Sequence, residues 1–67
     1  MKVVSIVIRT GNSAFGEDAF SEAVEMARIL ERLSRDVALT KFEIRPGVSR
    51  SLLDANGNTV GSFSVRA

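Results

Sequence analysis

The stretch RSLLDANGNTVGSFSV, at residues 50–65, decides the fold. Its centre, Asn56-Gly57, is the strongest short signal for a β-hairpin, because both residues tolerate positive backbone φ angles. The flanking runs, at residues 50–54 and 59–65, have the length and the bounding turn residues expected of strands. The sequence therefore predicts an antiparallel hairpin in the last third of the chain.

A further strand is predicted just before the hairpin. Residues 40–45 alternate between inward and outward positions, and Pro46-Gly47 then ends the run. Phe42 and Ile44 fall on one face, whereas the opposite face is charged: Lys41, Glu43 and Arg45. This alternation indicates a half-buried strand.

An amphipathic helix is predicted over residues 18–35. Its apolar positions recur every three or four residues, which places them along one stripe. The stripe consists of Phe20, Ala23, Val24, Ala27 and Leu30, widened by Met26, Ile29 and Leu33. Asp18 is the predicted N-cap.

The charges of this helix follow the helix dipole, with acidic residues first and basic residues last. The acidic group is Glu17, Asp18, Glu22 and Glu25, and the basic group is Arg28, Arg32 and Arg35. Paired carboxylates can carry out acid–base chemistry, but at this end of an amphipathic helix we interpret them as a solvated face. Arg28 and Arg32 repel each other four residues apart, at a cost of only about 0.2–0.5 kcal/mol.

Residues 2–9 form the first predicted strand. They are dense in β-branched residues, with Val4, Ile6 and Ile8 on one face and the following residues on the other: Val3, Ser5 and Val7. Apolar residues on both faces indicate an inner strand. The run is too short to span a membrane and no cleavage pattern follows it, so we interpret it as part of the mature protein.

The order of strand, helix, strand and hairpin indicates an α+β fold: a small, mainly antiparallel sheet with one helix packed on one face. A chain of 67 residues, 45% hydrophobic and 25% charged, has material for a single domain over residues 1–67. One helix covers only one face of a sheet, and Val3 and Val7 lie on the other. We therefore expect a homodimer that covers this second face.

The chain contains no histidine and no cysteine. It therefore lacks thiolate metal ligands, the commonest general base and any Ser/His/Asp or Cys/His arrangement. The segment DANGN, at residues 54–58, resembles the start of a calcium-binding EF-hand loop, but Thr59 and Val65 stand where that loop needs glycine and glutamate. We expect a non-enzymatic protein without metal or cofactor, in a reducing cytoplasm.

The charge balance bears on the kind of partner. Nine basic and eight acidic residues give a net charge of +1, well short of the basic excess that drives binding to a phosphate backbone. Proteins that bind single-stranded nucleic acid stack its bases on aromatic side chains of a sheet. We interpret the four phenylalanines of this chain as core residues instead. These four are Phe15, Phe20, Phe42 and Phe63.

The candidate partner-binding residues are Arg28, Arg32 and Arg35, joined by Lys41 and Arg45. The three arginines lie off the apolar stripe, so we expect their replacement by alanine to leave the fold intact. The alternative interpretation is that they only complement the negative end of the helix.

Three segments occur together in the chain: NSAF at residues 12–15, ARIL at 27–30 and LDANGNTVG at 53–61. In these segments the chain resembles a family of small proteins encoded by bacteriophages, prophages and related mobile elements. The resemblance implies a setting in a bacterial host cell but assigns no activity to named residues.

Small phage proteins without catalytic residues commonly bind a host protein, and anti-CRISPR inhibitors are the best known group of this size. The resemblance thus implies a non-enzymatic inhibitor of a host protein assembly, with a Cas effector complex as the leading candidate. Two alternatives stay open: a self-associating structural or accessory domain, and a weak nucleic-acid-binding module that acts through the arginine end of the helix.

Overall fold

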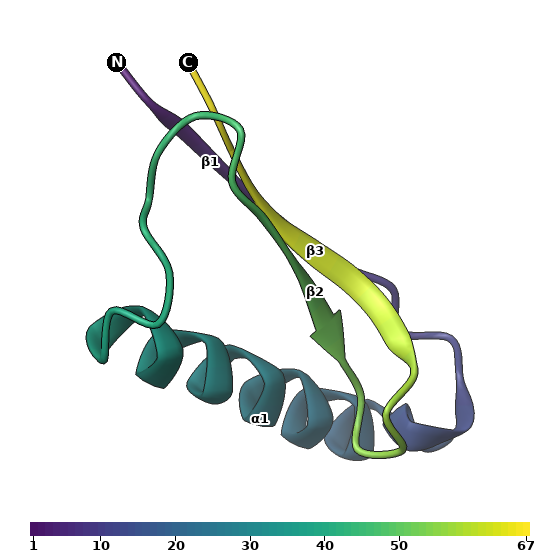
Figure 1. The fold of residues 1–67 in the computed structure, drawn as a ribbon. Helices are drawn as coiled ribbons and strands as arrows, with labels where there is room; N and C mark the ends of the chain where they lie inside the picture. The colour runs from purple at the N-terminus through teal and green to yellow at the C-terminus, as the bar shows by residue number, and fades with distance from the viewer.

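A computed structural model describes all 67 residues, and it contains three strands and one long helix. The elements are β1 (Val3–Ile8), a 3-10 turn η1 (Ser13–Phe15), α1 (Ala19–Ala38), β2 (Ser49–Leu53) and β3 (Thr59–Arg66). All strand pairs are antiparallel, in the order β1-β3-β2. α1 runs beneath one face of the sheet, close to the β2–β3 turn and further from the sheet at its other end (Figure 1). The predicted α+β fold is confirmed.

The predicted hairpin is formed by β2 and β3, joined by the loop at residues 54–58. Gly57 adopts a φ of +83°, whereas Asn56 keeps a negative φ. Only one of the two turn residues therefore adopts the positive φ that both tolerate. The Gly57 N–H donates to the Asp54 carbonyl at 3.1 Å, and the Asp54 N–H donates to the Asn58 carbonyl at 2.9 Å. The chain therefore reverses through a loop that is longer than a two-residue turn.

β1 is an edge strand, so the prediction of an inner strand is wrong. It pairs only with β3, with Val4 opposite Val65 and Ile6 opposite Phe63. β3 is the strand at the centre of the sheet, because both β1 and β2 pair with it. The apolar composition of β1 therefore does not reflect burial between two neighbouring strands.

The two faces of the sheet differ in chemistry. Residues opposite each other in an antiparallel pair share a face, so Val4, Ile6 and Ile8 lie on the same side as the core residues Phe63 and Val65. The face away from α1, here called the serine face, carries Ser5, Ser49, Ser51, Ser62 and Ser64. Val3 and Val7 also lie on this face, but it is largely polar, and the expectation of a second apolar face is not met.

The predicted N-cap of the helix is confirmed. The Asp18 carboxylate accepts a 2.7 Å hydrogen bond from the Ser21 N–H, and this bond lowers the pKa of Asp18. At the other end α1 continues to Ala38, where Thr40 ends it with a φ of +50°. The Lys41 N–H then donates to the Asp36 carbonyl, which completes a Schellman motif.

The predicted strand at residues 40–45 is absent, and this part of the chain forms a turn and a connecting loop. Its first residue, Thr40, is held in the left-handed conformation that ends the helix, which is incompatible with an extended strand. Phe42 nevertheless packs inward, with its ring 5.2 Å from that of Phe63 in an edge-on arrangement. The alternation therefore reflects one apolar anchor in a loop.

α1 buries only one border of the predicted stripe, formed by Ile29 and Leu33. Its buried row consists of Glu25, Ile29, Leu33 and Asp36. In contrast Phe20, the first residue of the predicted stripe, is 78% exposed, and Val24 and Leu30 are also exposed. The core is Phe15, Ile29, Leu33, Leu52, Val60, Phe63 and Val65. The interpretation of all four phenylalanines as core is therefore wrong for Phe20.

None of the helices in the structure combines the length and the apolarity that are needed to cross a membrane.

Candidate functional site

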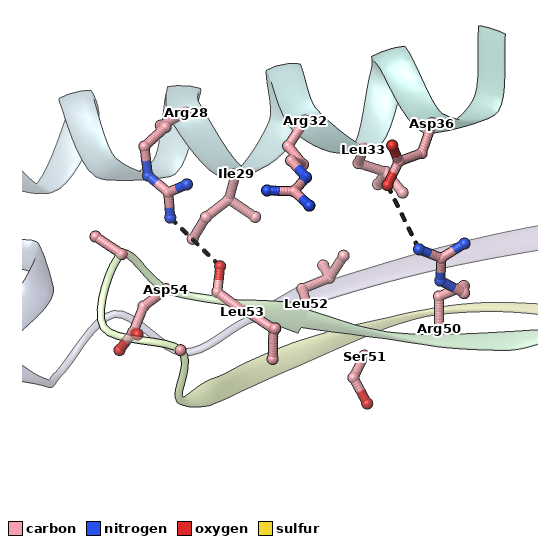
Figure 2. A pocket seen from close by; sticks show the side chains of 12 residues that line it. Arg28, Ile29, Arg32, Leu33, Asp36, Arg50, Ser51, Leu52, Leu53 and Asp54 are labelled. Atoms are coloured by element: carbon pink, nitrogen blue, oxygen red, sulfur yellow. Dashed lines mark hydrogen bonds and ion pairs between the residues drawn. The ribbon is translucent and has the colours of Figure 1, made fainter. Parts of the chain in front are cut away.

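A groove of about 310 Å³ lies between α1 and β2, beside the hairpin loop. Arg28 and Arg32 reach into it from the helix, and Arg50 approaches from the strand below (Figure 2). Ile29, Leu33 and Leu52 form its apolar floor. We call this feature the arginine groove, because these three guanidinium groups are its largest polar side chains.

The side chain of Arg28 is fixed by Glu25. Its Nε and Nη2 donate to the two oxygens of the Glu25 carboxylate at 2.8 and 3.0 Å, a bidentate geometry that orients a guanidinium strongly. Arg28 Nη2 also donates to the Leu53 carbonyl at 3.4 Å. A residue of the helix is thereby tied to the end of β2.

Glu25 is only 6% exposed, so its interpretation as part of a solvated face is wrong. Besides Arg28, its carboxylate accepts the Ala55 N–H at 2.7 Å. The bonds from Arg28 lower the pKa of Glu25, burial opposes this change, and the Ala55 N–H adds to it. Glu25 therefore remains ionised and connects α1 to the hairpin loop.

Arg28→Ala is expected to lower the melting temperature (Tm) by about 5 °C, because it removes both hydrogen bonds that Arg28 donates to the buried Glu25 carboxylate. Arg35→Ala is the matched control, since Arg35 pairs with Glu31 in solvent and such exposed pairs contribute little. Thermal unfolding followed by circular dichroism measures both variants. Equal Tm values for Arg28→Ala and Arg35→Ala would contradict a structural role for Arg28. The sequence alone predicts no such role for Arg28.

Arg50 is held at the other end of the groove. Its Nη2 donates to Asp36 Oδ2 at 3.4 Å, and its guanidinium carbon lies 4.6 Å from the centre of the Phe42 ring. Such a cation–π contact favours a planar, weakly hydrated guanidinium. Lys41 approaches the same carboxylate, with Nζ 3.8 Å from Asp36 Oδ1.

Arg32 stands between these two fixed arginines. It makes no ion pair and no side-chain hydrogen bond within the protein, and Figure 2 shows its guanidinium directed into the groove. Its five N–H donors are therefore free for a ligand.

Asp54 supports the groove from below by ordering the hairpin loop. Its Oδ1 accepts the N–H groups of Asn56 and Asn58 at 2.8 and 2.9 Å. Its Oδ2 accepts the Asn12 side-chain amide at 2.6 Å. Burial would raise the pKa of Asp54, but these hydrogen bonds outweigh burial and lower it.

The structure distributes the five predicted binding residues over different places. Arg28 and Arg32 lie together in the groove, and Lys41 lies beside Asp36 at its end. Arg35 and Arg45 lie outside it and pair with exposed acidic neighbours. The prediction missed Arg50. The hairpin register could have indicated it, because Arg50 and Leu52 are two residues apart and lie on the same face of the sheet. A charged residue at an inward position is a signal for a site.

The arrangement offers hydrogen-bond donors and positive charge rather than reactive groups. No cluster of three or more potential metal ligands is present in the structure. A planar fork of N–H donors matches the geometry of a carboxylate or a phosphate. The arginine groove is thus suited to receive an acidic side chain.

Together, fold and groove define a small α+β domain with three antiparallel strands, one long helix and an arginine-lined groove. Comparison of the chain with models of known protein families, with curated proteins and with solved structures found no match.

Proposed function

We propose that the protein is a non-enzymatic binding module that occludes a site on a partner protein by receiving an acidic side chain in the arginine groove. The unpaired guanidinium of Arg32 carries this proposal. Arg28 and Arg50, which flank it, have carboxylate partners within the chain. An acidic group of a partner supplies the missing partner for Arg32 and relieves its repulsion from Arg28.

The groove is preorganised for such a contact. The Glu25 carboxylate fixes Arg28, and Asp36 with the Phe42 ring fixes Arg50. Groups that are already ordered lose little conformational entropy on binding, which favours affinity. Arginines are frequent among the few residues that dominate the energy of an interface.

A protein partner fits the charge distribution better than nucleic acid. The net charge is +1, and the sheet face that is open to solvent carries serines in place of the aromatic residues on which bases stack. Weak nucleic-acid binding stays an outcome of the experiment below.

The resemblance to small proteins of phages and mobile elements supplies the biological setting of this proposal. We propose inhibition of a host protein assembly, and Cas effector complexes are the first candidates to examine. A self-associating accessory domain without a host partner is the alternative.

Arg32→Glu is expected to reduce partner recovery at least tenfold, because it places a carboxylate where the proposal requires a cation. Recovery is measured by affinity capture from bacterial lysate with and without nuclease, and with purified Cas effector complexes. Arg35→Glu is the matched control, since it makes the same charge change on the same helix outside the groove. Circular dichroism verifies that both variants are folded.

Each result of this experiment separates the candidate functions. Loss of binding in Arg32→Glu but not in Arg35→Glu supports the arginine groove. Equal recovery with both variants would place the contact elsewhere. A partner lost completely on nuclease treatment would favour the nucleic-acid module, and recovery of no protein would favour the accessory domain.

A further inference from the structure

The helix packs with its apolar stripe turned to one side. Ile29 is buried, and Leu30, about 100° further round the helix, is exposed on the side of β1. Arg28 and Arg32 lie on the opposite side, toward β2. The molecule therefore has a polar side at β2 and an apolar side at β1.

A second groove, of about 290 Å³, marks this apolar side. It runs between α1 and β1, and seven of its eight lining residues are hydrophobic. Its exposed walls are Val4, Ile6, Leu30 and Ile44. Large apolar side chains that line one groove together indicate a surface that becomes covered.

The free edge of β1 borders the same groove. The Arg9 N–H donates to the Val60 carbonyl, and because bonding alternates along an antiparallel pair, residues 3, 5 and 7 also face β3. The backbone N–H and C=O groups of Val4, Ile6 and Ile8 then point to the open edge. An unprotected apolar edge of this kind is a template for another strand.

The dimensions of the chain also indicate missing contacts. Its accessible surface is 4701 Å², whereas a compact monomer of its mass exposes about 4100 Å². The radius of gyration is 12.7 Å, against about 11 Å for a compact chain of this length. The excess of about 600 Å² approaches the roughly 800 Å² that each partner buries in a standard interface.

We propose that a second copy of this chain occupies the apolar side, by antiparallel pairing of β1 with β1 around a two-fold axis at Ile6. The two sheets join into one of six strands, with both helices on the same face. This inference is independent of the proposed binding function, because the arginine groove lies at the opposite edge of the sheet.

Pairing around Ile6 places apolar residues opposite apolar residues on the helix side of the sheet. Ile6 lies opposite Ile6 of the second copy, and Val4 lies opposite Ile8, so every new cross-strand pair on that side is apolar. A shift that centred the axis on Ser5 would instead place Lys2 opposite Ile8. Edge pairing also explains why the edge strand β1 is apolar. A dimer through the serine face, as expected from the sequence, would leave this edge uncovered.

The first test is the mass in solution. Sedimentation equilibrium is expected to give a dimer, twice 7.2 kDa, at high micromolar concentration. Ile6→Lys is expected to weaken dimerisation at least tenfold, because two lysines would face each other at the axis. Val7→Lys is the matched control: Val7 is 51% and Ile6 46% exposed, but Val7 lies on the serine face.

The second test does not require a disruptive variant. In the cysteine-free chain, Ile6→Cys places two Cα atoms about 5.5 Å apart across the axis, within disulfide range. Val7→Cys places them about 8 Å apart, beyond that range. Rapid oxidative cross-linking of Ile6→Cys alone supports the pairing. A monomeric mass, equal cross-linking of both variants, or a dimer unaffected by Ile6→Lys would overturn it.

Discussion

Gly61→Ala is expected to leave the chain largely unfolded. Gly61 lies in the central strand, opposite Ile8 of β1 and Leu52 of β2. A Cβ at this position would overlap the Val7 carbonyl oxygen and lie 2.8 Å from its carbon. Both atoms belong to backbone, so no rotation of a side chain can remove the overlap, and β1 must separate from β3.

The expected loss is about 3–5 kcal/mol, comparable with the entire stability of a small domain. Urea unfolding monitored by circular dichroism measures it. Gly11→Ala is the control, because a Cβ there meets no atom within 4 Å. A Gly61→Ala protein that unfolds at the urea concentration of the unaltered chain would show that β1 does not pack against β3 as described.

Local chemistry explains which elements were predictable from sequence. The hairpin follows from Asn56-Gly57, and the helix start follows from the Asp18 cap. Both signals act within a few residues, so they do not depend on the rest of the fold. The end of the helix was less predictable, because Thr40 is an unusual residue for the left-handed conformation that a Schellman motif needs.

Contacts with residues outside the helix decide which face of α1 is buried. Glu25 is buried because the Ala55 N–H lies thirty positions away in sequence but next to it in space. Asp36 is buried because Arg50, fourteen positions away, reaches it. A count of apolar positions instead selects the stripe through Phe20 and Leu30, which the monomer leaves exposed.

The candidate site was therefore only partly predictable. Arg28 and Arg32 share a helix face, which sequence spacing reveals, whereas Arg50 joins them only once the hairpin is docked against α1. The same docking turns the apolar stripe toward β1. The orientation of one helix thus separates a polar groove at β2 from an apolar one at β1.

Asp54→Ala is expected to lower Tm by on the order of 10 °C or more, because it removes the acceptor for several donors at once. The Asn56 and Asn58 N–H groups and the Asn12 amide all lose their partner. The loop at residues 54–58 would then lose its order, and with it the Ala55 N–H that binds Glu25. Asn58→Ala is the control, since it keeps the backbone N–H and removes only a long 3.4 Å side-chain bond.

The effect of Asp54 depends on its charge, which gives the prediction a pH dependence of known sign. Hydrogen bonds lower the pKa of Asp54 in the folded chain despite burial, so its ionised form stabilises the fold at neutral pH. This contribution is lost as the pH falls from about 4, the ordinary value of an aspartate, through the lowered pKa. The Tm difference between the unaltered chain and Asp54→Ala should therefore narrow between pH 7 and about pH 2. A constant difference would mean that loop packing, rather than the carboxylate, orders the hairpin.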